Sequence, residues 1–412
     1  MIAELLATAA NADARRTPRV APAIPSPNVR ERWRMGLEAR AMVLVTAVLL
    51  VFGLAVLYSA SAIVAMHEGH GSAYYLLRQI TGALAGIVAF AIAAKMDAGR
   101  WEKWAWPLMA IAGVTLLITV LPFTEAIAPR IHGSRRFLVA SSFQPSELGK
   151  LAVVMWTAML AVRKGDTLRR LTKGVLPFFV IVGILDVLVM LEPDLSTAML
   201  YTLLVAVLLF AAGARIGHFV LLGAVSIPIL WDQMQRLQYA LLRMSAFFDP
   251  GAAPREVGYQ LKQSLIAVGS GRLLGVGFGE GRQQLGFLPF PFNDFIGSNI
   301  GEEWGFVGLT LVIAAFALYG WLGVRIARSA RSTFLSLVAL GLTFTTVLTA
   351  FLHVGVVIGL LPTTGLTLPF VSYGRSNLVL SLVMTGILVN IGSTRERVVG
   401  ERATDPMAVA AR

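Results

Sequence analysis

Long apolar runs alternate with short polar segments over most of the chain. Most of these runs are about 18 residues or longer, which is enough for a helix to cross the hydrocarbon core of a bilayer. A soluble domain of this length has too little interior to bury them all. We therefore predict an all-α polytopic membrane protein with about ten transmembrane helices. The predicted helices lie at about 41–66, 78–94, 104–122, 147–162, 174–191, 195–213, 216–231, 304–326, 332–359 and 376–393.

Composition supports this class and narrows the chemistry. The 412 residues are 56% hydrophobic and only 14% charged, with a net charge of +12. The basic residues fall mainly between the apolar runs and in the tails, a distribution that excludes a nucleic-acid partner. The absence of cysteine excludes disulfides, thiol catalysis and cysteine metal sites.

The polar segments indicate three regions and an orientation. Residues 1–40, rich in Pro, Ala and Arg, are expected to form a disordered basic cytoplasmic tail. Residues 41–393 form the transmembrane domain, and 394–412 a second cytoplasmic tail. Every second connection carries Lys and Arg, for example 163–173. By the positive-inside rule, these connections and both termini are cytoplasmic.

Two outward segments, 123–145 and 232–303, are longer than connectors need to be. The second is the large extracytoplasmic loop between predicted helices 7 and 8. Residues 234–248 within it have the pattern of an interfacial amphipathic helix that carries Arg243. The glycine-rich stretch 269–281 fits no nucleotide-binding spacing, and we interpret it as a flexible hinge near the cation Lys262.

The segment 289–306 holds Asp294, Glu302 and Glu303. A carboxylate can take the proton of a reacting hydroxyl. The bulky apolar neighbours of Asp294 favour a raised pKa for its carboxyl group. The alternative for the two glutamates is that they cap the next helix, and the sequence leaves that choice open.

A second polar group precedes predicted helix 4. Arg135 and Arg136 are candidates to bind phosphate, and Gln144 stands just before the helix. Glu147 and Lys150 are three residues apart on one helical face, where they can line a pocket or simply form an ion pair at a helix end.

Isolated polar residues inside apolar runs are weaker candidates. Asp186 lies within a predicted span, and intramembrane acids often mark a cavity or an ion pair. Asp194 follows Glu192 and Pro193 at the break between two spans. For His353, a buried contact between helices is favoured over catalysis.

Five motifs occur in an order that resembles the SEDS family of membrane glycosyltransferases. The string 360–374, LLPTTGLTLPFVSYG, is similar to the signature of its cell-division branch rather than its elongation branch. The other motifs are FQPSELGK at 143–150, EPDL at 192–195, GYQ followed by QSLIAVGSG at 258–271, and DFI followed by EEWGF at 294–306.

The resemblance implies an inverting peptidoglycan glycosyltransferase that polymerises lipid II into glycan strands at the outer face of the bacterial cytoplasmic membrane, for septal synthesis in cell division. Asp294 would be the catalytic base. A divalent cation, Mg²⁺ or Mn²⁺, is implied, and no organic cofactor. The implied partners are lipid II, the growing strand, a class B penicillin-binding protein and other division membrane proteins. The implied substrate-binding residues are Arg135, Arg136, Gln144, Glu147, Lys150, Asp194, Lys262, Glu302, Glu303, Ser372 and Tyr373.

The chain departs from the family pattern at several positions. Ser196 replaces a glycine, and Arg375 and Asn377 stand in the stretch where SYGGSS is usual. Phe292 and Asn293 replace the usual histidine and threonine, and His353 a frequent asparagine. Three alternatives remain at this point: a flippase for the lipid-linked precursor that depends on charges such as Asp186, a non-catalytic division scaffold, and an elongation-type polymerase.

Overall fold

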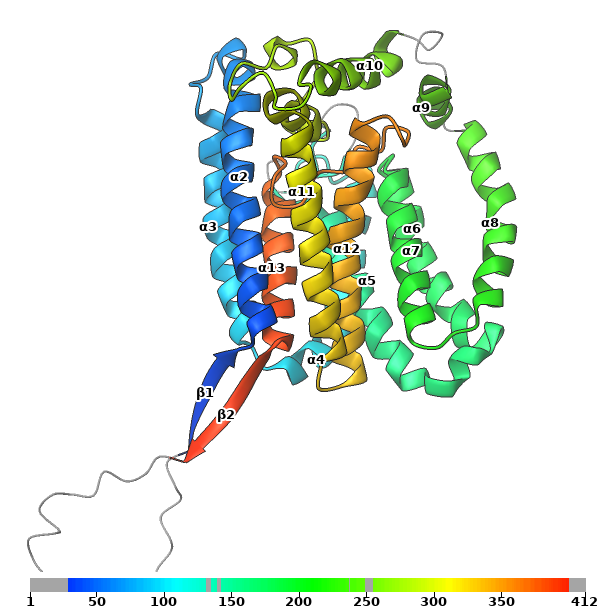
Figure 1. Ribbon diagram of the computed structural model, residues 1–412. Helices are drawn as coiled ribbons and strands as arrows, with labels where there is room; N and C mark the ends of the chain where they lie inside the picture. Colours follow the sequence, from blue (N-terminus) through cyan, green and yellow to red (C-terminus); the bar gives the residue numbers. More distant parts are fainter. Residues whose placement is uncertain (1–28, 131–134, 139–141, 237, 249–254, 400–412) are drawn as a thin grey trace, which may run out of the picture. The chain divides into compact units, whose positions relative to one another are not determined.

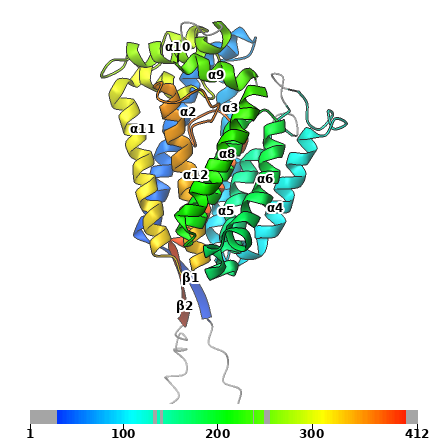
Figure 2. The same ribbon diagram turned by 90° about the vertical axis from the view of Figure 1, so that its right-hand side faces the viewer.

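The computed structural model describes residues 29–130, 135–138, 142–236, 238–248 and 255–399. In this part the regular structure is helical apart from one two-stranded sheet (Figure 1). Helices that run side by side make up residues 35–393, and α10 lies across one end of them (Figures 1 and 2). The α-helices are α2 Leu37–His67, α3 Tyr74–Lys95, α4 Ala98–Val120, α5 Pro145–Lys164, α6 Leu176–Leu191, α7 Leu195–Ala211, α8 Ile216–Arg236, α9 Gln238–Phe248, α10 Arg255–Ser270, α11 Ile296–Arg328, α12 Thr333–Val357 and α13 Arg375–Ile391.

Each of the ten predicted ranges overlaps one of these helices. Six helices of the described part are long and apolar enough to cross a bilayer, and shorter apolar helices lie at Leu195–Ala211, Ile216–Pro228 and Arg375–Ile391. The chain is therefore a multi-pass α-helical membrane protein, as predicted. That all ten ranges cross the bilayer stays a prediction.

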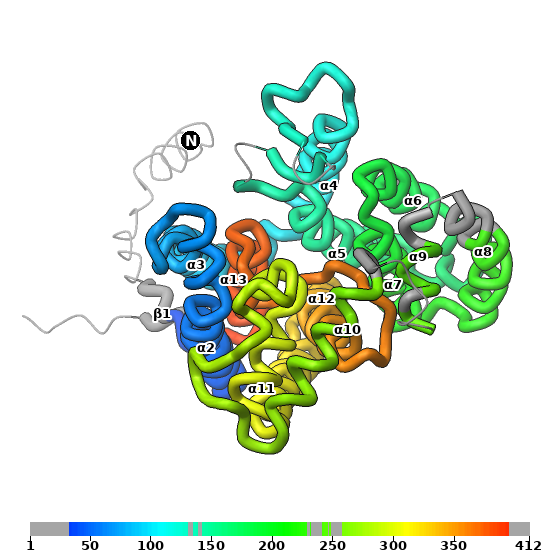
Figure 3. The backbone as a smooth tube through the Cα atoms, turned by 90° about the horizontal axis from the view of Figure 1, so that it is seen from above, coloured from blue at the N-terminus to red at the C-terminus, as the bar shows by residue number. Residues whose placement is uncertain are grey.

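The packing of neighbouring helices follows the apolar pattern. Viewed along the helices, α3 lies beside α13, α11 beside α12, and α4 beside α5 (Figure 3). Helix α5 has its side chains buried on every face, including Trp156, because it also contacts α7 and α12. Helix α8, in contrast, has mostly exposed side chains up to Pro228. Its main packing partner in the described part of the chain is α9.

The outward loop contains more regular structure than the sequence pattern predicts. Helix α8 continues to Arg236, and the amphipathic helix is α9, Gln238–Phe248. Helix α10 was not predicted, because its residues are too polar to stand out by hydropathy. Helix α11 begins at Ile296, eight residues before the predicted start at 304, and its backbone is interrupted at Gly305.

The predicted terminal regions differ from the structure at their inner ends. Residues 1–28 and 400–412 lie outside the described part. Val29–Met35 forms strand β1 and pairs with Ser393–Val399, strand β2, so these parts of the expected tails are extended rather than unstructured. Leu37 already begins α2, four residues before the predicted helix start at 41. The two strands were not predicted because they are held by hydrogen bonds between main-chain groups, which leave no apolar pattern in the sequence.

Candidate active site

Asp294 lies in an irregular turn directly before α11 and is half-buried. A Cβ atom added to Gly365 would lie 3.9 Å from its Oδ2 atom, so the 360–373 signature loop passes close to the carboxylate. Burial raises the pKa of the Asp294 carboxyl group, and the cations Arg243 and Arg136 oppose that rise. The site therefore combines one proton acceptor with two guanidinium groups that act on it.

Ser372 and Tyr373 bind the backbone of this turn. The Ser372 hydroxyl donates to the carbonyl oxygen of Asn293 at 2.6 Å, and the Tyr373 amide donates to that of Phe292 at 2.9 Å. The rings of Phe292 and Tyr373 are also in contact, with centroids 5.7 Å apart. These two residues thus fix the backbone immediately before Asp294.

His353 links α12 to the same region. Its Nε2 atom accepts from the Gly297 amide at 3.2 Å, and its Nδ1 atom lies 2.9 Å from the Leu366 carbonyl oxygen. The acceptor role of Nε2 requires the tautomer in which Nδ1 carries the proton. His353 is a buried contact, as predicted, and it joins the start of α11 to the signature loop.

The two predicted phosphate-binding arginines have different surroundings. Arg135 donates to the Leu121 carbonyl at 3.0 Å and pairs with the exposed carboxylate of Glu125, so it is used within its own loop. Arg136 donates to the carbonyl oxygens of Glu192 at 2.8 Å and Pro193 at 2.5 Å. Only Arg136 of this pair is among the cations that act on Asp294.

Asp194 and Glu192 form hydrogen bonds that stabilise the break between α6 and α7. Asp194 caps α7, because its carboxylate accepts from the Thr197 amide at 3.1 Å and the Thr197 hydroxyl at 2.9 Å. Glu192 is buried and accepts from the Thr119 hydroxyl. Burial raises the pKa of Glu192 to about 8.

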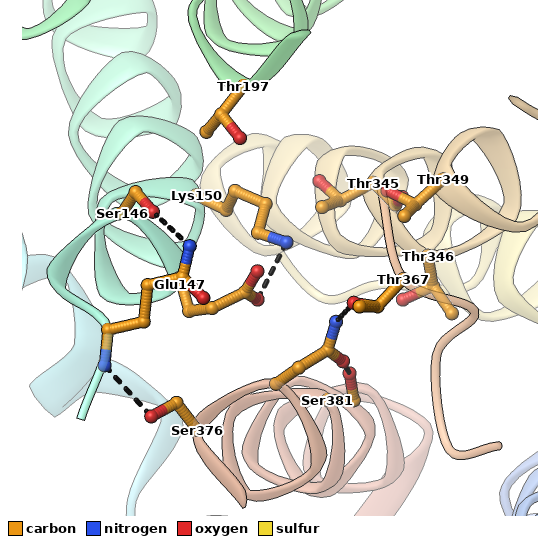
Figure 4. Close-up of polar contacts among 12 residues, drawn as sticks. Ser146, Glu147, Lys150, Thr197, Thr345, Thr346, Thr349, Thr367, Ser376 and Ser381 are labelled. Carbon is orange, nitrogen blue, oxygen red and sulfur yellow. Dashed lines mark hydrogen bonds and ion pairs between the residues drawn. The ribbon is translucent and has the colours of Figure 1, made fainter. Parts of the chain in front are cut away.

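Glu147 and Lys150 form a buried ion pair on α5, with Nζ and Oε2 2.6 Å apart. Threonines of α12 and Thr197 of α7 lie around the pair, and Ser381 of α13 lies nearby (Figure 4). Gln144 stands at the N-cap of α5. Its side-chain amide donates to the Ser146 hydroxyl at 3.0 Å, and its backbone amide donates to the Ser376 hydroxyl at 2.9 Å. These residues make a second polar cluster, among α5, α7, α12 and α13.

Glu302 and Glu303 lie deep in the first part of α11 and do not cap its first turn. Glu302 accepts from the backbone amides of Arg282 at 2.9 Å and Gln283 at 3.2 Å. Glu303 accepts from the hydroxyl of Ser59 on α2. Both carboxylates are therefore used in contacts within the protein. Glu302 binds the loop at 282–283 to α11, and Glu303 binds α11 to α2.

The glycine-rich stretch is an ordered partner of α11 rather than a flexible hinge, which corrects the prediction. Gly305 has φ 65° and ψ −162°, and this interruption leaves backbone groups of α11 without helical partners. The glycine-rich stretch supplies them: the amides of Val276 and Gly277 donate to the carbonyls of Glu302 and Glu303 at 3.0 and 3.1 Å.

The structure thus separates the predicted site residues into groups. Ser372 and Tyr373 bind the turn that carries Asp294, and Arg136 and Arg243 act on its carboxylate through their charge. Lys262 is exposed on α10. Arg243 was not among the predicted site residues, because a single arginine on an amphipathic helix has no local sequence signal that points to a distant aspartate.

Comparison with known proteins identifies the family. Residues 39–397 match the FtsW/RodA/SpoVE family model, described as "Cell cycle protein". The chain is 36% identical over 367 residues to the "Probable peptidoglycan glycosyltransferase FtsW" of Trichlorobacter lovleyi, covering 89% of this chain and 96% of that protein. It is also 36% identical over 352 residues to "Stage V sporulation protein E" of Bacillus subtilis, covering 85% and 95%.

Solved structures show the same fold. A chain from the study "Structural coordination of polymerization and crosslinking by a peptidoglycan synthase complex" aligns with a TM-score of 0.70 at 23% identity, over 86% of this chain and 97% of that one. Thermus thermophilus "Rod shape determining protein RodA" aligns with a TM-score of 0.61 at 22% identity, over 85% and 95%. The chain therefore belongs to the FtsW/RodA/SpoVE family of cell cycle proteins.

Proposed function

We propose that this protein is a peptidoglycan glycosyltransferase that polymerises lipid II for septal wall synthesis. The observation that carries the proposal is the half-buried Asp294 in a non-helical turn, with Arg243 and Arg136 acting on its charge. Non-helical backbone at the edge of a helical membrane domain is stable where it lines a cavity rather than lipid. The names of the relatives agree with this activity.

In the proposed reaction Asp294 is the general base. The hydroxyl oxygen of the acceptor sugar attacks the anomeric carbon of the donor sugar, and its proton passes to the Asp294 carboxylate. The bond between the anomeric carbon and the diphosphate oxygen breaks, and the electron pair leaves with the polyprenyl diphosphate. A single displacement of this kind inverts the configuration at the anomeric carbon.

The leaving diphosphate needs positive charge, and we assign this role to Arg243 and Arg136, the two cations that act on Asp294. Guanidinium groups suit this role because they bind phosphate oxygens in a bidentate manner. Arg135, paired with Glu125, and the exposed Lys262 are less suited than the sequence suggested. The proposed diphosphate site therefore uses one predicted cation and one from α9.

A divalent cation fits the site only together with substrate. The described residues contain no group of three or more His, Asp or Glu that could hold a metal ion by themselves. Mg²⁺ commonly binds through one or two carboxylates and the phosphate oxygens of a substrate. The substrate diphosphate would then supply its ligands, Asp294 would stay free to act as the base, and the ion would neutralise negative charge on the leaving group.

We also propose a crosslinking partner, a class B penicillin-binding protein. The support is the synthase complex named above, which coordinates polymerisation with crosslinking. The septal rather than elongation role is supported by the FtsW-named relatives and by the wording of the 360–374 signature. Recruitment of other division membrane proteins and the cytoplasmic location of both termini belong to the same proposal.

The test is polymerisation of labelled lipid II by the purified protein, with and without the partner. Asp294→Asn should lower the rate by about 100-fold or more, because a positioned base contributes that much. Asp186→Asn is the matched control, because Asp186 is a second carboxylate and lies within α6. No glycan strands under any condition, together with movement of lipid II across liposomes that Asp186→Asn abolishes, would support the flippase instead.

A further inference from the structure

The signature loop beside Asp294 is held by side chains that this chain does not share with the family pattern. Ser196, which replaces a glycine, donates its hydroxyl to the Thr364 carbonyl at 2.8 Å. Asn377, in the altered SYGRSN stretch, donates its side-chain amide to the Thr367 hydroxyl. Two departures on different helices, α7 and α13, thus bind the same short segment, 363–367.

This segment has no regular backbone pairing of its own, so its conformation depends on contacts from neighbouring elements. It is non-helical, and its central residue Gly365 is exposed with φ 76°. Glycine in such a segment has many accessible backbone states, so the neighbours must be fixed from outside. Arg243 supplies a third contact, to the Thr363 carbonyl at 3.0 Å, and the Nδ1 atom of His353 a fourth, to the Leu366 carbonyl at 2.9 Å.

The segment matters because of what it faces. Gly365 is the residue of the loop next to the Asp294 carboxylate. A shift of this segment changes the space in which the acceptor hydroxyl must approach Asp294. A glycine at 196 has no side-chain donor. A serine at 377 has a shorter side chain than asparagine and cannot reach the Thr367 hydroxyl in the same way.

We propose that Ser196 and Asn377 are coupled positioning residues that hold segment 363–367 against Asp294; their role in turnover rests on the function proposed above. Ser196→Gly and Asn377→Ser remove these two side-chain contacts. Each should lower kcat for glycan polymerisation about three- to tenfold, the loss expected for one hydrogen bond, with little change in KM. The variant with both changes should be within about twofold of the worse single variant, because the two contacts hold the same five residues.

Controls separate positioning from general damage. Ser196→Thr restores the hydroxyl and should restore the rate, whereas Ser196→Ala should behave like Ser196→Gly. Ser329→Ala removes a hydroxyl that donates only to the Ile326 carbonyl one turn earlier, and it should leave the rate unchanged. Two unchanged single variants would overturn the proposal, and rate losses that multiply in the double variant would overturn the coupling.

A second readout does not need turnover. The chain has no cysteine, so Thr363→Cys provides a single label site within the segment. Adding Ser196→Gly should raise its maleimide labelling rate about threefold or more, because the segment opens more often. An unchanged labelling rate would overturn the positioning role even if Asp294→Asn proved fully active and the proposed reaction were wrong.

Discussion

At the scale of single residues, the site depends on the pKa of Asp294, which burial raises and the charges of Arg243 and Arg136 lower. The ionised carboxylate is the active form of a base, so the rate falls as the pH falls through its pKa. Burial raises this pKa, so the acidic limb of the kcat/KM profile should lie at higher pH than for an exposed aspartate. Arg243→Gln removes a cation that lowers the pKa and should move the limb higher still.

The same Arg243→Gln variant should lower kcat by on the order of 100-fold at its best pH, since a donor to the leaving group is lost. Arg135→Gln is the matched comparison, because Arg135 pairs with Glu125 within its own loop. An acidic limb that stays in place in Arg243→Gln would show that Arg243 does not act on Asp294.

The buried Glu147–Lys150 pair allows a stability prediction. Glu147→Gln leaves the Lys150 ammonium buried without its counter-ion, and we expect a loss of about 3 to 5 kcal/mol in the free energy of unfolding. Glu147→Gln combined with Lys150→Met removes both charges and should regain most of that loss. Denaturant titration in micelles measures both, and equal losses in the two variants would contradict the interpretation.

At the scale of elements, the interruption of α11 requires glycine. Gly305 has φ 65°, and a Cβ atom there would lie 2.3 Å from the amide nitrogen of Gly275. Gly305→Ala should therefore destabilise the protein by about 3 kcal/mol or more, visible as a lower Tm. Gly183→Ala in α6 meets no atom within 4 Å and should instead raise the stability by about 0.5 to 1 kcal/mol.

The sequence predicted the helices that are apolar and missed those that are not. All ten ranges fall on helices because hydropathy and length are local properties. Helix α10 and the first turns of α11 are polar and are stabilised by tertiary contacts, such as the Ser264 and Ser298 hydroxyls 2.7 Å apart. Motif matching located Asp294, Ser372 and Tyr373, but not Arg243, since its contact with the Thr363 carbonyl is a long-range property.

At the scale of the whole molecule, orientation in the membrane is testable because the chain has no cysteine. Glu125→Cys lies in the loop after α4, where Glu125 is 63% exposed. It should react with a membrane-impermeant maleimide added to spheroplasts. Arg169→Cys, between α5 and α6, should react only after lysis. The reverse pattern would invert the topology and place Asp294 on the cytoplasmic side.

The pairing of the glycine-rich stretch with α11 also limits how this protein can vary in length. Besides the two bonds from Val276 and Gly277, the amides of Phe306 and Val307 donate to the carbonyls of Arg272 and Leu273 at 2.9 and 3.1 Å. These four bonds fix a register between two chain segments. A single-residue insertion or deletion between 273 and 276 would break that register and move the positive-φ glycines out of place, although the stretch looks like a permissive loop. Tags or fusions are better placed elsewhere, for example at the exposed turn around Gly69, where no atom lies within 4 Å of an added Cβ.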